Sequence, residues 1–195
     1  MKQKLLAMVV LAALVDALPR TAQSQMWIPA VGGGPAFAMG DLKDSGTETG
    51  WLGFAGLDYT LAAMPGATVG VSLSYAHIPY EGTADDATNI PAATVDVAYA
   101  FGAATGAKIQ PYVRAGIGVL QHKYDAGSST GGDESETKLA GAAGVGISLN
   151  MGPVTPFVGV HYITGGSDTQ YYTIYAGLAF PMSGMTSTMS RIRPR

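Results

Sequence analysis

The chain of 195 residues carries 11 basic and 14 acidic residues, contains no cysteine and is 47% apolar. Its acidic balance excludes binding of nucleic acid, because phosphate contacts need a basic surface, and the lack of cysteine excludes a disulfide-stapled scaffold. Only 13% of the residues are charged, compared with ~25% in soluble domains. Beyond the first 24 residues this low charge comes without any long apolar run, which favours strands over membrane helices.

Residues 1–24 have the pattern of a secretory signal peptide. Lys2 and Lys4 precede the apolar run 5–15, and Ala-Gln-Ser at 22–24 offers small residues before a cleavage site. Charged residues just behind the apolar run keep an uncleaved anchor as the alternative, although 11 apolar residues fall short of the ~20 that a spanning helix needs. We therefore predict that the chain is exported and that this segment is not part of the fold.

The rest of the chain alternates between bulky apolar and small residues with a period of two, which is typical of β-strands. In 69–76, for example, Val69, Val71 and Leu73 share one face, while glycine, serine and alanine occupy the other. This pattern predicts eight strands. They lie at 27–38, 51–62, 69–76, 94–102, 109–121, 138–149, 154–163 and 170–180.

The connections between these strands alternate in length. Four longer, polar links lie at 39–50, 79–91, 122–137 and 164–169, and three short turns lie at 63–68, 102–108 and 150–153. Each short turn contains glycine, as tight turns require. The alternation predicts an antiparallel up-and-down meander in one domain, with all the long links at the same end.

Eight amphipathic strands can close with the bulky face outward, as a transmembrane barrel, or inward, as a soluble lipocalin-like barrel with a ligand cavity. The interior of eight strands is only wide enough for side chains to fill it, and the small face fits there. A soluble barrel also needs charges on its outer wall, which the small face lacks. We therefore predict an all-β, eight-stranded transmembrane barrel, and keep the soluble barrel as the alternative.

The placement of charge agrees with an outward apolar face. Of the 13 acidic residues after position 24, 11 lie in the long links, and the other two, Asp58 and Asp96, lie on the small-residue face of their strands. Arg114 also lies on the small-residue face of its strand, the face that would point into the barrel. Since Arg on the lipid wall costs roughly 2–4 kcal/mol at the midplane, we predict an interior polar cluster with Arg114 as its hub. Its expected members are Arg114, Asp96, Asp58, Tyr112, Tyr175 and His161.

Other chemistry has weak support in the sequence. His77 with Ser72, Ser74 and Glu81 lacks the spacing of an acyl-transfer site, and Thr164 stands where His161 would need a serine. Three scattered histidines without cysteine do not form a zinc pattern, and the acidic third link lacks the spacing of an EF-hand. We expect no enzymatic activity, cofactor or metal, and solvated charge as the role of the third link.

With its leader, eight alternating strands, the openings "QPYVRAGIGV" and "TPFVGVHY" and a final strand "YAGLAF", the chain resembles small outer-membrane β-barrels of the OmpA/OmpX type. The resemblance implies short turns in the periplasm, long links outside the cell, and contact with outer-membrane lipid. It also implies that the outer-membrane assembly machinery reads Phe180 as the terminal aromatic. A tail that ends in Arg191, Arg193 and Arg195 departs from many relatives; a solvated tail is favoured over contact with anionic lipid or the cell wall.

The expected organisation is a signal peptide at 1–24, a barrel at 25–182 and a basic periplasmic tail at 183–195. The expected function is a structural or cell-surface interaction barrel in the outer membrane, with a side-chain-filled interior and a possible extracellular partner at the acidic links. A narrow or gated pore and the soluble ligand-binding barrel are the two alternatives.

Overall fold

The computed structural model describes residues 26–82, 86–125 and 134–183. The predicted signal peptide, the tip of the acidic third link and the tail beyond Ser183 lie outside these residues. Among the described residues, no helix is both long and apolar enough to cross a bilayer.

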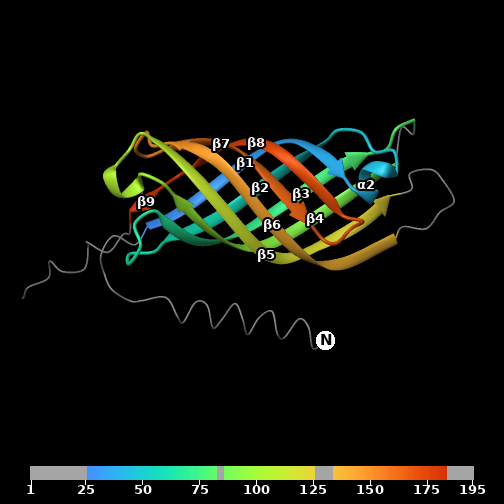
Figure 1. Cartoon of the computed structure of the whole chain (residues 1–195), viewed down its shortest axis with the longest axis horizontal. Helices are drawn as coiled ribbons and strands as arrows, with labels where there is room; N and C mark the ends of the chain where they lie inside the picture. The colour runs from blue at the N-terminus through green and yellow to red at the C-terminus, as the bar shows by residue number, and fades with distance from the viewer. Residues whose placement is uncertain (1–25, 83–85, 126–133, 184–195) are drawn as a thin grey trace, which may run out of the picture.

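Eight antiparallel strands form a closed up-and-down barrel, as predicted, because β1 pairs with both β2 and β8 (Figure 1). A two-residue strand, β9, adds to the start of β1. Helix α2 (Asp41–Asp44) and a 3-10 turn (Ala103–Thr105) lie in two of the connections. The strands are β1 (Met26–Met39), β2 (Gly50–Thr60), β3 (Ala67–Pro79), β4 (Ala87–Ala100), β5 (Ile109–Asp125), β6 (Glu134–Leu149), β7 (Thr155–Thr164), β8 (Gln170–Ala179) and β9 (Met182–Ser183).

The strands reach farther into the long links than predicted. β4 begins at Ala87, and the β5–β6 ladder continues to the pair Tyr124 and Glu134. Polar sequence misled the prediction here, because a strand pair that extends into water still satisfies its backbone groups through the ladder. The first link contains a short helix, α2, which lies at the opposite end of the barrel from β9 (Figure 1).

The bulky face of the strands points outward. Ile117 is 71% exposed and Leu139 is 78% exposed, values that a soluble barrel would not tolerate over its whole wall. The soluble alternative is therefore wrong. The outward positions that are exposed on several strands include Val31, Leu57, Val71, Leu73, Val97, Val113, Val145, Ile147, Val158, Val160, Ile174 and Leu178.

Aromatic rings border this apolar wall at both ends. At the short-turn end Trp27 packs on Tyr59, with ring centroids 4.9 Å apart. Ten residues farther along β1, at the end with the long links, Phe37 stacks on Tyr172, also at 4.9 Å. About 9–11 tilted residues span a bilayer and aromatic residues border the apolar band of membrane barrels, so these rings mark the two interfaces of a transmembrane band.

The interior is filled unevenly along the barrel axis. In the half nearer the long links, apolar side chains pack into a dense core, and Leu42 of α2 joins it from above. We call this core the apolar plug; it comprises Ala36, Leu42, Leu52, Ala76, Ile78, Ile90, Ala92, Leu120, Ala140, Ala142, Ile163 and Tyr171. The half nearer the short turns instead encloses a cavity. The predicted filling is thus correct for one half of the barrel and wrong for the other.

Candidate functional site

Arg114 of β5 lies inside the barrel and forms an ion pair across its lumen. Its Nη2 atom is 2.7 Å from Oδ1 of Asp58, on β2, and donates a hydrogen bond to that oxygen. β2 and β5 are not neighbours in the sheet, so this contact ties opposite parts of the wall together. The side chains of both residues are 16% exposed, and the exposed part faces the cavity that they help to line.

Asp96 lies deeper than Asp58 and is a more distant partner of Arg114. The separation from Arg114 Nη2 to Asp96 Oδ2 is 3.8 Å, and the Asp96 side chain is only 1% exposed. Its charge is met by hydroxyl donors instead: Ser72 donates at 2.5 Å, and Thr94 at 3.0 and 3.2 Å. Both carboxylates were expected in this cluster, and Asp58 rather than Asp96 is the nearer partner of the guanidinium.

The two tyrosines expected in the cluster meet beside the ion pair. The hydroxyl oxygens of Tyr112 and Tyr175 are 2.8 Å apart. Two glycines make room for these rings: a Cβ on Gly146 would lie 2.5 Å from the Tyr112 hydroxyl, and one on Gly159 would lie 2.8 Å from the Tyr175 hydroxyl. The small residues of β6 and β7 therefore leave the space that the two tyrosine rings fill at the same height in the barrel.

His161 also points into this layer but makes no side-chain hydrogen bond among the described residues. Its Nε2 atom and the Nε atom of Arg114 are both buried without a partner there. The His161 ring packs edge-on against Tyr175, with centroids 6.2 Å apart. Its contribution within the described residues is thus one of packing.

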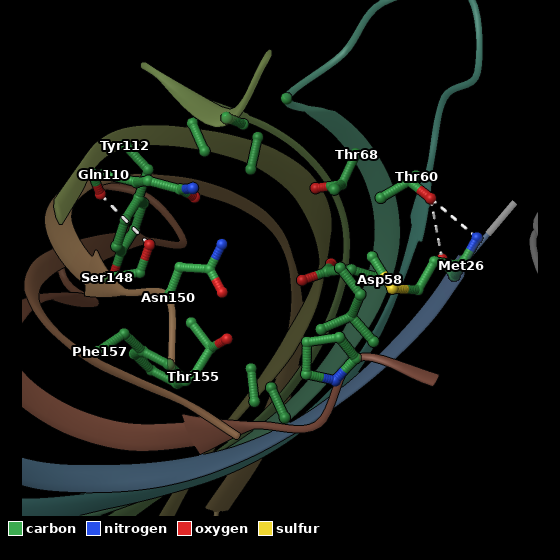
Figure 2. A pocket seen from close by; sticks show the side chains of 18 of the residues that line it. Met26, Asp58, Thr60, Thr68, Gln110, Tyr112, Ser148, Asn150, Thr155 and Phe157 are labelled. Carbon is green, nitrogen blue, oxygen red and sulfur yellow. Dashed lines mark hydrogen bonds between the residues drawn. The ribbon is translucent and has the colours of Figure 1, made fainter. Parts of the chain in front are cut away.

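A cavity of about 760 Å³ opens from the cluster toward the short turns. Its floor holds Asp58, Arg114, Tyr112 and Tyr175, and Figure 2 shows the Asp58 carboxylate pointing into the space that Thr68, Asn150 and Phe157 surround. Hydrogen bonds brace its rim, where Thr60 bonds the backbone of Met26 (Figure 2). We call this space the turn-end cavity.

A second polar group covers the apolar plug at the end with the long links. Lys138 donates to Glu136 at 3.2 Å and, through a short bond, to Asp168. This hydrogen bond holds the pKa of Asp168 below its ordinary value. Nearby, His122 lies 2.9 Å from the Thr169 hydroxyl. Sequence reasoning missed this group, although the interior parity of His122 and Lys138 was a usable signal.

The residues considered for acyl transfer do not form a site. His77 lies on the outer face, where it bonds Asn89 at 2.8 Å, while Ser72 and Ser74 point into the lumen. His161 faces the lumen and Thr164 has the opposite parity on the same strand. Among the described residues, no group of three potential metal ligands comes together.

Phe180 follows β8 directly and is 38% exposed on the outer side of the barrel. Its backbone N–H donates to Pro29 of β1 at 2.8 Å, which closes the seam between the last strand and the first. The role of Phe180 as an assembly signal remains a prediction.

No protein-family model and no curated protein matches the chain. Solved structures do match its fold. Neisserial surface protein A (NspA) superposes with a TM-score of 0.61 at 16% identity, covering 81% of this chain and 99% of that one. Ail, the attachment invasion locus protein of Yersinia pestis, gives 0.56 at 17%, covering 82% and 99%. The N-terminal β-barrel domain of Pseudomonas aeruginosa OprF gives 0.54 at 17%, covering 82% and 98%.

The closed eight-stranded barrel, its exposed apolar wall and its two aromatic borders define the class of this protein as a small outer-membrane β-barrel, as predicted. The exposed apolar wall is that of an integral membrane protein, in which the wall meets lipid, and the solved barrels that share the fold include outer-membrane proteins.

Proposed function

We propose that the protein is a closed structural barrel that does not conduct and that meets the exterior through its acidic long links. The observation that carries this proposal is the apolar plug. Ile78, Ile90 and Tyr171 in it are fully buried, and Leu120 and Ile163 are nearly so. Hydrated ions would lose their water there without gaining polar partners, at a cost of many kcal/mol.

Single-channel recording on the refolded mature chain, that is, residues 25–195 without the predicted signal peptide, tests the closed state. We expect heat-modifiable, strand-rich protein to insert into planar bilayers without discrete conductance steps. Leu120→Ala combined with Ile163→Ala removes two plug side chains and is the matched opening variant. Steady conductance by the wild-type chain would contradict the proposal, whereas steps seen only in the double variant would support it.

A gated pore is the second candidate, and the turn-end cavity favours it. Half of the lumen is already wide enough to hold water and ions, down to Arg114 and Asp58. The Arg114 cluster at the floor of the cavity, the apolar plug and the polar group above the plug would all have to rearrange. Voltage-dependent steps from the wild-type chain, which vanish when the plug is overpacked by Ala92→Leu, would favour this candidate over a closed barrel.

The acidic links favour a basic extracellular partner. The four long links contain 11 acidic residues but only two lysines, Lys43 and Lys123. Ail has been solved in complex with the heparin analogue sucrose octasulfate, and the charge of the present links opposes such a polyanion. We expect nanodisc-embedded protein to bind immobilised polylysine but not heparin, with binding that weakens as salt rises. Tighter binding to heparin would refute a basic partner.

A further inference from the structure

The turn-end cavity has a charge imbalance at its floor. Two carboxylates, Asp58 and Asp96, share the single guanidinium of Arg114. Asp96 is buried behind the floor and is supplied with three hydroxyl hydrogen bonds from Ser72 and Thr94. Asp58 contacts Arg114 through Oδ1, and the described residues supply no partner for its other oxygen. The negative charge in excess therefore lies at the surface of the cavity.

No other charged side chain lines this cavity among the described residues. Its walls are uncharged: apolar and aromatic side chains such as Ile28, Leu61 and Phe157 alternate with neutral polar ones such as Thr68 and Asn150, and Tyr112 and Tyr175 lie beside Asp58. Aromatic faces attract cations, by about 0.5–2 kcal/mol. A volume of about 760 Å³ lies within the 300–1,000 Å³ typical of small-molecule sites.

We propose that the turn-end cavity is a binding site for a small organic monocation with an apolar or aromatic body. Its ammonium group would contact the open side of Asp58, and its body would pack on the aromatic wall. An anion of the same size would meet Arg114 only beside two carboxylates, so the site discriminates by charge sign. The site is distinct from the acidic links and does not depend on whether the barrel conducts.

The entrance to this site lies among the short turns. Ala62, Pro65 and Gly66 of the first turn, Ala103 of the second and Pro153 of the third line the cavity. The apolar plug closes the other side. A ligand therefore enters only from the short-turn side of the membrane, and the floor lies within the width of the bilayer.

Ligand titrations test the proposal on the full mature chain in phosphatidylcholine nanodiscs. Nitrogen-15 NMR and calorimetry detect binding in these titrations. The probes are benzyltrimethylammonium, the neutral benzyl alcohol and the anion benzoate. We expect the cation to bind at least about tenfold more tightly than either of the others, a difference of about 1.4 kcal/mol. Amide shifts are expected at Gly66 and Asn150, which line the cavity, and not at Lys43 in α2.

Asp58→Asn is expected to weaken binding of benzyltrimethylammonium about tenfold or more, whereas Asp41→Asn, which removes a carboxylate outside the barrel, leaves it unchanged. If Asp58→Asn does not refold, Ala100→Phe provides a second test, because it fills the cavity from its wall and leaves the ion pair intact. This variant is also expected to lose binding of benzyltrimethylammonium. Equal binding of the cation and benzyl alcohol, tighter binding of benzoate, or full binding by either cavity variant would overturn the proposal.

Discussion

Arg114 shows how one charged residue can be accommodated within a membrane-spanning barrel. It joins Asp58 of β2 directly and lies near Asp96 of β4, so that three strands converge on one guanidinium. Burying charges costs several kcal/mol per ion before they attract each other. The cluster therefore makes partner removal costly, even if the complete set adds little net stability.

Arg114→Met should lower the free energy of unfolding by about 3 kcal/mol, because it leaves two interior carboxylates without their cation. The double variant Arg114→Met with Asp58→Asn should lose less than the sum of the two single variants. Urea unfolding in lipid vesicles provides the measurement, with Ser148→Ala as a neutral interior control. Simple additivity of the two substitutions would show that the ion pair is not energetically coupled.

The glycines of β6 allow a second residue-scale prediction. A Cβ on Gly146 would press against the backbone carbonyl oxygen of Val158 and, at 2.5 Å, against the Tyr112 hydroxyl, whereas one on Gly141 would meet only Thr164 Cγ2 at an ordinary 3.5 Å. Gly146→Ala should therefore destabilise the barrel by about 1–3 kcal/mol through overpacking. Gly141→Ala on the same strand is the matched control, with an expected change within about 0.5 kcal/mol. Equal effects in urea unfolding would argue against tight packing around Tyr112.

Parity alone was enough to predict which residues of the cluster face the lumen. It assigned Asp58, Asp96 and Arg114 to the small-residue face, and the structure has all three inside. Parity does not give the stagger of strands around a closed barrel, which determines the depth of each side chain. For that reason the sequence could not decide which carboxylate lies nearer to Arg114. Asp58 is the nearer one, although its strand β2 is three positions from β5 in the sheet, whereas Asp96 lies on the adjacent strand β4.

At the scale of the strand, one face meets lipid over a limited height. On β5, Ile117 pairs with Val95, and Val113 pairs with Tyr99, whose ring packs on Phe101 next to the second short turn. Gln121 and Lys123 continue the same outward face beyond the band. Ile117 therefore lies near the middle of the membrane, and Gln121 near its edge.

Ile117→Arg should cost about 2–4 kcal/mol, because an arginine at the midplane loses its hydration. Gln121→Arg, on the same strand and face, should cost no more than about 1 kcal/mol, since the interface tolerates this charge. Both variants can be compared by unfolding in vesicles and by the yield of heat-modifiable protein. A similar cost at the two positions would mean that the apolar band has been placed at the wrong height.

The division of the lumen into a filled half and a hollow half could not be predicted from each strand considered alone. Small interior residues indicated a filled barrel, but filling depends on which large side chains share a layer. Ile90, Leu120 and Tyr171 meet at one level and form the plug, whereas Ala98, Ala100 and Ala179 border the cavity at another. Helix α2 was also missed, although it adds Leu42 to the plug, because four residues carry almost no helical periodicity.

At the scale of the whole molecule, the two ends of the barrel differ in chemistry. The end with the long links has an acidic surface over an apolar plug, and the short-turn end opens into the turn-end cavity. Because the two ends differ, the orientation of the barrel in the membrane determines which compartment the turn-end cavity faces. The cavity serves the periplasm if the short turns lie there, as the resemblance to OmpA/OmpX-type barrels implies.

Single-cysteine labelling tests this orientation cleanly, because the chain has no cysteine of its own. Lys43→Cys places a thiol on α2, and Ala104→Cys places one in the short 3-10 turn at the opposite end; both positions are exposed. On intact cells, a membrane-impermeant maleimide should label Cys at position 43 and leave position 104 unlabelled until the outer membrane is permeabilised. The reverse pattern would put the acidic links in the periplasm and open the turn-end cavity to the outside, so that a cationic ligand would have to arrive from the medium.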